Sequence, residues 1–144
     1  MYIVKDTGQL TNELKEANDI EKFVNDNEEH FRDFTLESYL KYLLETKQLN
    51  KADVIRDSKL DIGYAYHIFA GQKKRPAREK ILSVALAMKL EVEEAQRLLY
   101  YAGAETLYVR NPWDSVILFA LDKHLSVEET NDLLNNLSEA ANLG

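Results

Sequence analysis

Apolar residues recur at helical spacing along most of this chain, and the polar residues between them form helix starts and stops. Thr35 can cap a helix whose apolar positions share one face, at Leu36, Tyr39, Leu40, Leu43 and Leu44. Only two prolines, Pro76 and Pro112, and five glycines interrupt the pattern. No sustained alternation of β-branched residues is present, so the sequence predicts an all-α protein.

Four more helices are predicted in the second half of the chain. They run from Pro76 to Leu90, from Val92 to about Ala102, from Pro112 to Leu125, and onward from Ser126. Gly103 stops one of them, and Asn111-Pro112 is typical of a helix start. Ser126 and Glu129 have the spacing of a capping box. Residues 108–111 are expected to form a linker.

Residues 81–99 and 116–134 match each other at an offset of 35 residues, which indicates a repeated helical hairpin. Each second helix begins with paired acids, Glu93-Glu94 in one copy and Glu128-Glu129 in the other. Catalytic carboxylates are one interpretation of these acids. Acidic residues are also favoured in the first turn of a helix, and we prefer that explanation. We expect the second hairpin either to extend the core or to supply a dimer surface.

The stretch from Leu49 to Arg78 combines two short helix patterns, a turn and a basic loop. Asn50 can cap the first helix, and Asp61 can cap a second helix that runs to about Ala70. Gly71 then stops the second helix. Three cations follow at Lys73, Lys74 and Arg75. Two short helices with a tight turn, followed by a cationic loop, are typical of a DNA-binding helix-turn-helix.

This stretch resembles the Cro/repressor (lambda-repressor-like, XRE) family of bacterial and phage regulators, and the resemblance extends over roughly residues 36–102. It is carried by Leu49-Asn50-Lys51-Ala52-Asp53-Val54-Ile55, by the Ile68 to Gly71 step, and by Gly71-Gln72-Lys73-Lys74-Arg75-Pro76. The chain departs from the family's usual Gln, Ala, Gly and Glu at four positions, which here are Lys51, Ile55, Lys59 and Phe69. The resemblance implies a lambda-repressor-like domain.

Carried across residue by residue, the resemblance also implies which side chains meet DNA. Base-edge contacts would come from Lys51, Ile62, Gly63, Tyr64 and His67, and phosphate contacts from Lys73, Lys74, Arg75 and Arg78. Ile62 can only meet a thymine methyl group or fill space, and Gly63 has no side chain. Either specificity therefore depends on DNA shape and phosphates, or the scaffold binds a protein instead of DNA.

The net charge of −7 is unevenly distributed along the chain. Residues 35–80 contain ten basic and six acidic side chains, a net charge of +4, whereas residues 1–34 carry −5 and residues 81–144 carry −6. The positive excess therefore coincides with the helix-turn-helix pattern. Because exposed charges farther apart than about 8 Å are largely screened at physiological salt, a basic patch on an acidic chain can still bind phosphate. The alternative is a solvated surface cluster.

The acidic segment of residues 1–34 is predicted to be helical. Its apolar residues fit one amphipathic helix and are Leu10, Leu14, Ala17, Ile20 and Val24. Asn18-Asp19 could equally divide this helix into two. The segment is either an extra helix packed on the domain, or an arm that binds a protein partner or lies over the basic patch.

Catalytic and metal-binding patterns are scarce. The chain has no cysteine, and its three histidines, His30, His67 and His124, are not spaced as metal ligands. A Gly-rich phosphate loop and a Gly-x-Ser-x-Gly elbow are both absent. We therefore expect no enzymatic activity, no cofactor and no metal. No signal peptide and no apolar run of roughly 20 residues is present, so we expect a cytoplasmic protein without a membrane span.

These patterns predict three regions: an acidic N-terminal helical segment (residues 1–34), a lambda-repressor-like domain (residues 35–109) and a C-terminal helical hairpin (residues 110–144). The leading hypothesis is a regulator of transcription that binds double-stranded DNA. It would be a homodimer, because such domains read paired half-sites. The alternative is a protein-interaction module that keeps the helix-turn-helix scaffold and regulates a partner protein.

Overall fold

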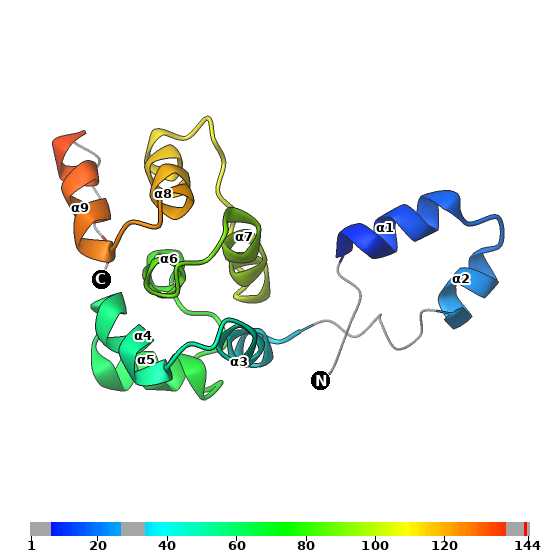
Figure 1. The fold of residues 1–144 in the computed structure, drawn as a ribbon, viewed down its shortest axis with the longest axis horizontal. Helices are drawn as coiled ribbons and strands as arrows, with labels where there is room; N and C mark the ends of the chain where they lie inside the picture. The colour runs from blue at the N-terminus through cyan, green and yellow to red at the C-terminus, as the bar shows by residue number, and fades with distance from the viewer. Residues whose placement is uncertain (1–6, 27–33, 138–142, 144) are drawn as a thin grey trace. The chain divides into compact units, whose positions relative to one another are not determined.

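The computed structural model describes residues 7–26, 34–137 and 143 of the chain (Figure 1). All regular secondary structure in these residues is helical, which confirms the all-α prediction. None of the described helices is long and apolar enough to cross a membrane. The chain forms two compact units, Met1–Asp33 and Phe34–Gly144, and each is described by itself.

The first unit contains helices α1 (Thr7–Glu16) and α2 (Ile20–Asp26). Of the two arrangements that the sequence left open, the structure has the divided one. Asp19 starts the second helix, because its Oδ1 accepts hydrogen bonds from two amides in the first turn of α2, at 3.0 and 3.3 Å. Phe23 is buried, whereas three residues of the predicted apolar stripe are exposed: Leu14, Ile20 and Val24.

The second unit contains seven helices in its described residues. They are α3 (Leu36–Thr46), α4 (Lys51–Ser58), α5 (Ile62–Phe69), α6 (Arg78–Ala87), α7 (Val92–Tyr101), α8 (Pro112–Asp122) and α9 (Val127–Asn136). Helix α6 contacts α4, α7, α8 and α9, and in Figure 1 it lies in the middle of this unit. The hairpin of α8 and α9 therefore packs on the same core as the helices before it.

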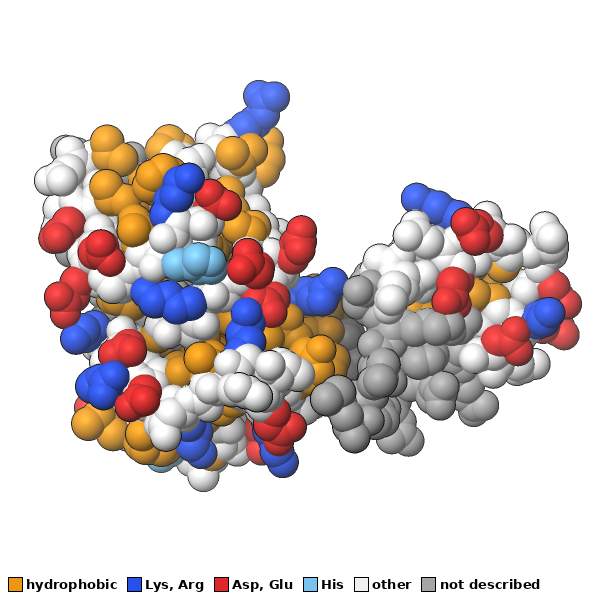
Figure 2. Space-filling view, in the orientation of Figure 1, with side chains coloured by type: hydrophobic (Ala, Val, Ile, Leu, Met, Phe, Trp, Pro, Cys, Tyr) orange, Lys and Arg blue, Asp and Glu red, His pale blue; other side chains and the backbone are white. Residues whose placement is uncertain are grey.

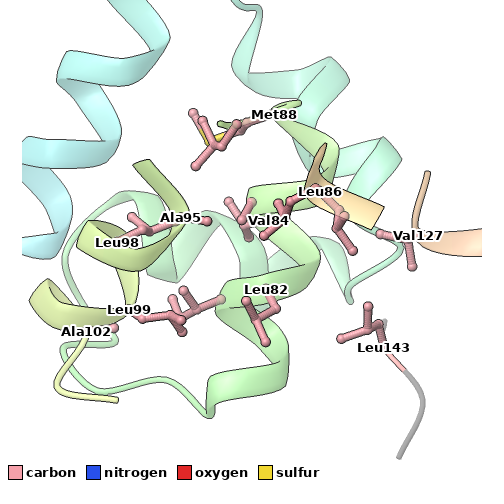
Figure 3. Packing of buried hydrophobic residues seen from close by; sticks show 14 of the residues in the cluster. Leu82, Val84, Leu86, Met88, Ala95, Leu98, Leu99, Ala102, Val127 and Leu143 are labelled. Atoms are coloured by element: carbon pink, nitrogen blue, oxygen red, sulfur yellow. The ribbon is translucent and has the colours of Figure 1, made fainter. Parts of the chain in front are cut away.

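Helix α6 is the centre of the hydrophobic core. Six consecutive residues of this helix are buried: Ile81, Leu82, Ser83, Val84, Ala85 and Leu86. Six successive residues point in every direction around a helix, so neighbouring helices must cover α6 on all sides. Figure 3 shows part of this core, where side chains from α6, α7 and α9 meet. The buried Ser83 hydroxyl donates to the carbonyl of Glu79 at 2.9 Å, so its polar group is satisfied.

Side-chain caps form at the helix starts that the sequence predicted. Thr35, Asn50 and Asp61 each accept a hydrogen bond from the backbone amide three residues further on, at 3.0–3.1 Å. These bonds satisfy amides that have no partner inside the first turn of a helix. The predicted caps of α3, α4 and α5 are therefore confirmed.

The predicted limits of α6 were wrong at both ends. The helix starts at Arg78 and not at Pro76, because Ala77 keeps an extended backbone with a ψ of 146°. It also ends earlier than predicted, at Ala87, because Lys89 takes a left-handed conformation with a φ of 55°. Periodicity alone cannot place such limits, since apolar residues continue beyond the last helical turn.

The repeat in the sequence is also a repeat in the structure. The turns of the α6–α7 and α8–α9 hairpins each contain one residue of positive φ, Lys89 at 55° and His124 at 54°. Lys89 Nζ donates to the carbonyl of His124 at 2.9 Å, which joins the two turns. Glu94 and Glu129 complete capping boxes at the starts of α7 and α9. The paired acids therefore act in helix starts, as we preferred on sequence grounds.

Each hairpin is followed by the same pair of hydrogen bonds, which the sequence pattern did not suggest. The side-chain amide of Gln96 bonds to both backbone groups of Leu107, at 2.9 and 2.7 Å. The amide of Asn131 bonds in the same way to Leu143, also at 2.9 and 2.7 Å. Both leucines are buried. Each amide thus fastens a chain segment whose leucine fills the core.

A partly buried ion pair joins the first hairpin to the second. Arg78, at the start of α6, donates to both carboxylate oxygens of Asp114 in α8, at 2.9 and 2.8 Å. The same guanidinium donates to the carbonyls of Glu105 and Thr106, at 2.8 and 3.1 Å. Asp114 also accepts the amide of Tyr108 at 2.9 Å. These bonds fix the connection between α7 and α8.

The ion pair changes the acidity of Asp114. Burial would raise the pKa of this carboxyl, which belongs to a residue only 4% exposed. Hydrogen bonds from Arg78 and from the Tyr108 amide, together with the positive charge of Arg78, outweigh burial and lower the pKa below its usual value. The ionised form of Asp114 therefore stabilises the folded protein.

Replacing Asp114 by Ala should lower the free energy of unfolding by about 3 kcal/mol, because the Arg78 guanidinium would stay partly buried without its partner. Urea denaturation at neutral pH, followed by circular dichroism, measures this change. Asp122→Ala is the matched control on α8, since Asp122 is exposed. The control should change stability by about 0.5 kcal/mol or less. Equal losses for the two variants would contradict a structural role for the ion pair.

The pH dependence of the same measurement separates the ion pair from packing. Because the pKa of Asp114 is lowered by folding, its stabilisation is present above the unfolded-state pKa of about 3.9 and is lost as the pH falls through the folded-state value. The difference between wild type and Asp114→Ala should therefore be constant above about pH 5 and shrink below about pH 4. A difference that persists unchanged in acid would assign the loss to packing.

Candidate nucleic-acid interface

Helices α4 and α5 are joined by a tight turn of three residues, Lys59, Leu60 and Asp61. Lys59 takes the left-handed conformation, with a φ of 63° and a ψ of 14°. Leu60 is buried and anchors the turn in the core. Asp61 caps α5 through the amide of Tyr64. The turn thus brings α4 and α5 into contact.

Helix α5 has one buried and one exposed face. The buried residues follow the predicted helical spacing and are Ala65, Ile68 and Phe69. The exposed residues, which we call the outer face of α5, are Ile62, Gly63, Tyr66 and His67. Ile62 is 66% exposed and Tyr66 is 41% exposed, while Tyr64 is half-buried. Tyr66 was not among the predicted base contacts, although its position four residues after Ile62 places both on one face.

Two lysines from neighbouring segments lie over tyrosine rings of α5. Lys51 Nζ, at the start of α4, is 5.7 Å from the ring centroid of Tyr66. Lys73 Nζ, in the loop after α5, is 5.5 Å from the ring centroid of Tyr64. Exposed cation–π contacts contribute about 0.5–1 kcal/mol each, enough to favour one position of an ammonium group that stays in water. Lys51 therefore lies beside the outer face of α5, and Lys73 lies beside the half-buried Tyr64.

The basic loop is fixed to the end of α5 by its backbone. The amide of Gln72 donates to the carbonyl of His67 at 2.9 Å, and the amide of Gly71 donates to the carbonyl of Ile68 at 3.2 Å. Gly71 has a φ of 80°, and together these features make a Schellman ending. A side chain at Gly71 would also collide with the carboxylate of Glu37 in α3. The first residues of the loop are thus held in place while the cations that follow remain exposed.

Four exposed cations lie at the start of α4 and in the basic loop: Lys51, Lys73, Lys74 and Arg75. The side chain of Arg75 lies beside Gly103, after α7. In the described part of the chain, none of the four forms an ion pair with a carboxylate. The other cation on α4 is different, because Arg56 pairs with Asp53 and Asp57 at 3.2 and 3.1 Å. These four cations therefore remain available to an anionic ligand.

Arg78 does not belong to this group, although the sequence analysis placed it among the phosphate contacts. Its Nε, Nη1 and Nη2 atoms all donate hydrogen bonds inside the protein, and the ring of Trp113 lies 5.8 Å from its Cζ. The guanidinium therefore holds the connection between α7 and α8. Asp114 is 36 positions away along the chain, so spacing could not have indicated this pairing.

On the side of the molecule that Figure 2 shows, Lys and Arg side chains are interspersed with Asp and Glu. The carboxylate of Asp61 and that of Glu37 also lie near the ends of α5, at its cap and beside Gly71. An anionic ligand would therefore be attracted by the local cations and not by a large uniform field.

No family model, no curated protein and no solved structure matches this chain. The residues that the structure describes contain no group of three or more His, Asp or Glu side chains that could hold a metal ion.

Gly63 and Gly71 should respond to alanine in opposite directions. A Cβ at Gly63 would meet Asp61 Oδ2 at 3.4 Å, an ordinary contact, so Gly63→Ala should raise the free energy of unfolding by about 0.5–1 kcal/mol. Gly71→Ala should lower it by about 1–2 kcal/mol, because alanine would be left-handed there and Glu37 would have to move. Urea denaturation measures both changes. A destabilised Gly63→Ala would show that the fold itself requires this glycine.

Proposed function

We propose that this protein is a DNA-binding regulator of transcription in which α4 and α5 form a helix-turn-helix. The observation that carries this proposal is the exposed outer face of α5, with Lys51 of α4 over Tyr66 and Lys73 of the basic loop over the neighbouring Tyr64. In a helix-turn-helix, the second helix enters the major groove and its N-terminal residues contact base edges. Ile62 and Gly63 occupy that position in α5, and Tyr66 and His67 follow one turn later.

The basic loop suits the phosphate backbone. Lys73, Lys74 and Arg75 are exposed and directly follow the proposed recognition helix. Phosphate contacts orient a protein on a duplex and supply much of its affinity without reading sequence. We propose that Lys51, at the start of α4, contacts either a base edge or a phosphate. Tyr64 and His67 add hydrogen-bonding groups for base contacts.

The turn between α4 and α5 supports the resemblance to the Cro/repressor family. That family usually has glycine where this chain has Lys59. Lys59 has a φ of 63°, a conformation that glycine adopts without steric cost. Lysine pays about 1 kcal/mol for the same backbone, so the departure from the family pattern costs stability and leaves the turn in place.

A protein-interaction module on the same scaffold is the second candidate. Its support is the apolar character of the outer face, where Ile62 is 66% exposed and Tyr66 41% exposed. The acidic N-terminal segment offers another protein-binding surface through the exposed Leu14, Ile20 and Val24. Either way, we propose a cytoplasmic protein that acts by binding, without a cofactor and without enzymatic activity. Failure to bind any duplex at low salt would favour this second candidate.

Affinity for double-stranded DNA should fall steeply with salt, and the basic loop should set part of the slope. Replacing Lys74 and Arg75 by Ala should weaken binding to all duplexes alike. The slope of log affinity against log salt should drop by about 0.9 for each phosphate that the variant no longer neutralises. Fluorescence anisotropy with labelled duplexes across a salt series measures both effects.

A matched variant controls for net charge. Arg110→Ala with Lys22→Ala also removes two exposed cations, but these lie in the α7–α8 connection and in α2. This control should leave the salt slope within error of the wild-type value. The same slope for both double variants would show that the loop does not contact phosphates.

We also propose that the protein binds DNA as a homodimer, since helix-turn-helix proteins read paired half-sites. The chain itself buries most of the apolar side chains of α8: Val116, Ile117, Ala120 and Leu121. We propose that the dimer contact is made by the apolar side chain of α8 that stays exposed. This side chain is Phe119, at 51% exposed. Light scattering should give a protein mass of twice 16.6 kDa in the DNA complex, and Phe119→Ser should weaken the dimer. One chain per complex would contradict the homodimer.

A further inference from the structure

We infer that the DNA site contains a thymine whose 5-methyl group is read by Ile62, and that Gly63 lets the start of α5 approach that base pair closely. This inference rests on the proposed function and adds to it the chemistry of the recognised base. It is carried by two neighbouring residues whose identities the fold does not explain.

Ile62 is the first of these residues. It is the first residue of α5, is 66% exposed, and is not among the residues of the core or those packed against it. A branched apolar side chain in this position gains little from folding. In the major groove, the one apolar group that a base pair presents is the methyl of thymine. An exposed isoleucine at the tip of a recognition helix therefore matches thymine and no other base.

Gly63 is the second residue whose identity the fold does not explain. Its φ is not left-handed, and a Cβ there would meet Asp61 Oδ2 only at ordinary contact distance, 3.4 Å. Neither backbone strain nor packing requires glycine at this position, while alanine would favour the helix. Glycine is otherwise found where a backbone must come close to a ligand. Its place directly beside Ile62 indicates that the approach and the methyl contact occur together.

The groups beside Ile62 are polar, so they can bond to the polar atoms that surround a thymine methyl group. Tyr66 lies on the same face as Ile62, and Lys51 is held 5.7 Å from the centre of its ring. The ammonium group and the tyrosine hydroxyl can bond to the oxygens and nitrogens of adjacent base edges or to phosphates. Ile62 alone then distinguishes thymine from a base that lacks the methyl group.

Uracil provides the test, because it keeps the hydrogen-bonding groups of thymine and lacks only the methyl. The full-length protein is first used to select its tightest duplex from a random library. Each thymine of that duplex is then replaced in turn by uracil, and affinity is measured by anisotropy. At one thymine in each half-site, wild-type affinity should fall about fourfold, the effect of one buried methyl group. Ile62→Ala should bind the thymine and uracil duplexes equally at that position.

Two further variants sharpen the result. Val109→Ala removes an apolar side chain that is 68% exposed in the α7–α8 connection, and it should keep the wild-type preference for thymine. Gly63→Ala should bind both duplexes several-fold more weakly while its free energy of unfolding stays at or above the wild-type value.

The outcomes separate the inference from the function on which it rests. Binding that is unaffected by uracil at every position would overturn the inference and leave the DNA-binding function intact. A preference for thymine that survives in Ile62→Ala would also overturn it. The absence of binding to any duplex at low salt would refute the proposed function itself.

Discussion

The ion pair between Arg78 and Asp114 joins the start of α6 to α8 and to the connection between α7 and α8. Asp114 is 4% exposed and accepts two bonds from the guanidinium, which also binds two carbonyls of the α7–α8 connection. The carboxylate and the guanidinium would each be costly to bury alone, so the connection cannot shift without breaking the pair. Arg78 also starts α6, so the same residue holds one end of the basic loop. The Schellman ending at Gly71 holds the other end.

In the second unit, the residues that form the core are different from the residues that are free to bind a ligand. α6 is buried on all sides, and the inner face of α5 adds Ala65, Ile68 and Phe69 to the same core. The outer face of α5 contributes little to that core, and the cations beside it are unpaired in the described residues. Because folding does not dictate the identities of Ile62 and Gly63, a ligand is the simplest explanation for them. That is the physical basis of both proposals.

Local chemistry made much of this fold predictable from the sequence. Caps at Thr35, Asn50 and Asp61 depend on hydrogen bonds within one turn, so the residue types alone were sufficient. Contacts between distant segments were not predictable in this way. Arg78 looked like one more cation of the basic loop, because its partner lies 36 positions further on. The bonds of Gln96 to Leu107 and the position of Lys51 over Tyr66 likewise depend on how the helices pack.

The central claim is that the outer face of α5 and the basic loop meet DNA, and a backbone amide map by nuclear magnetic resonance tests it most directly. The full-length protein would be titrated with its selected duplex, and the shift of each assigned amide followed. We predict that the large shifts fall at the start of α4, at residues 62–67 and at residues 71–75, while α8 changes only at a dimer contact near Phe119. Shifts confined to α1, α2 or the α8–α9 hairpin, or no shifts at all, would contradict the account.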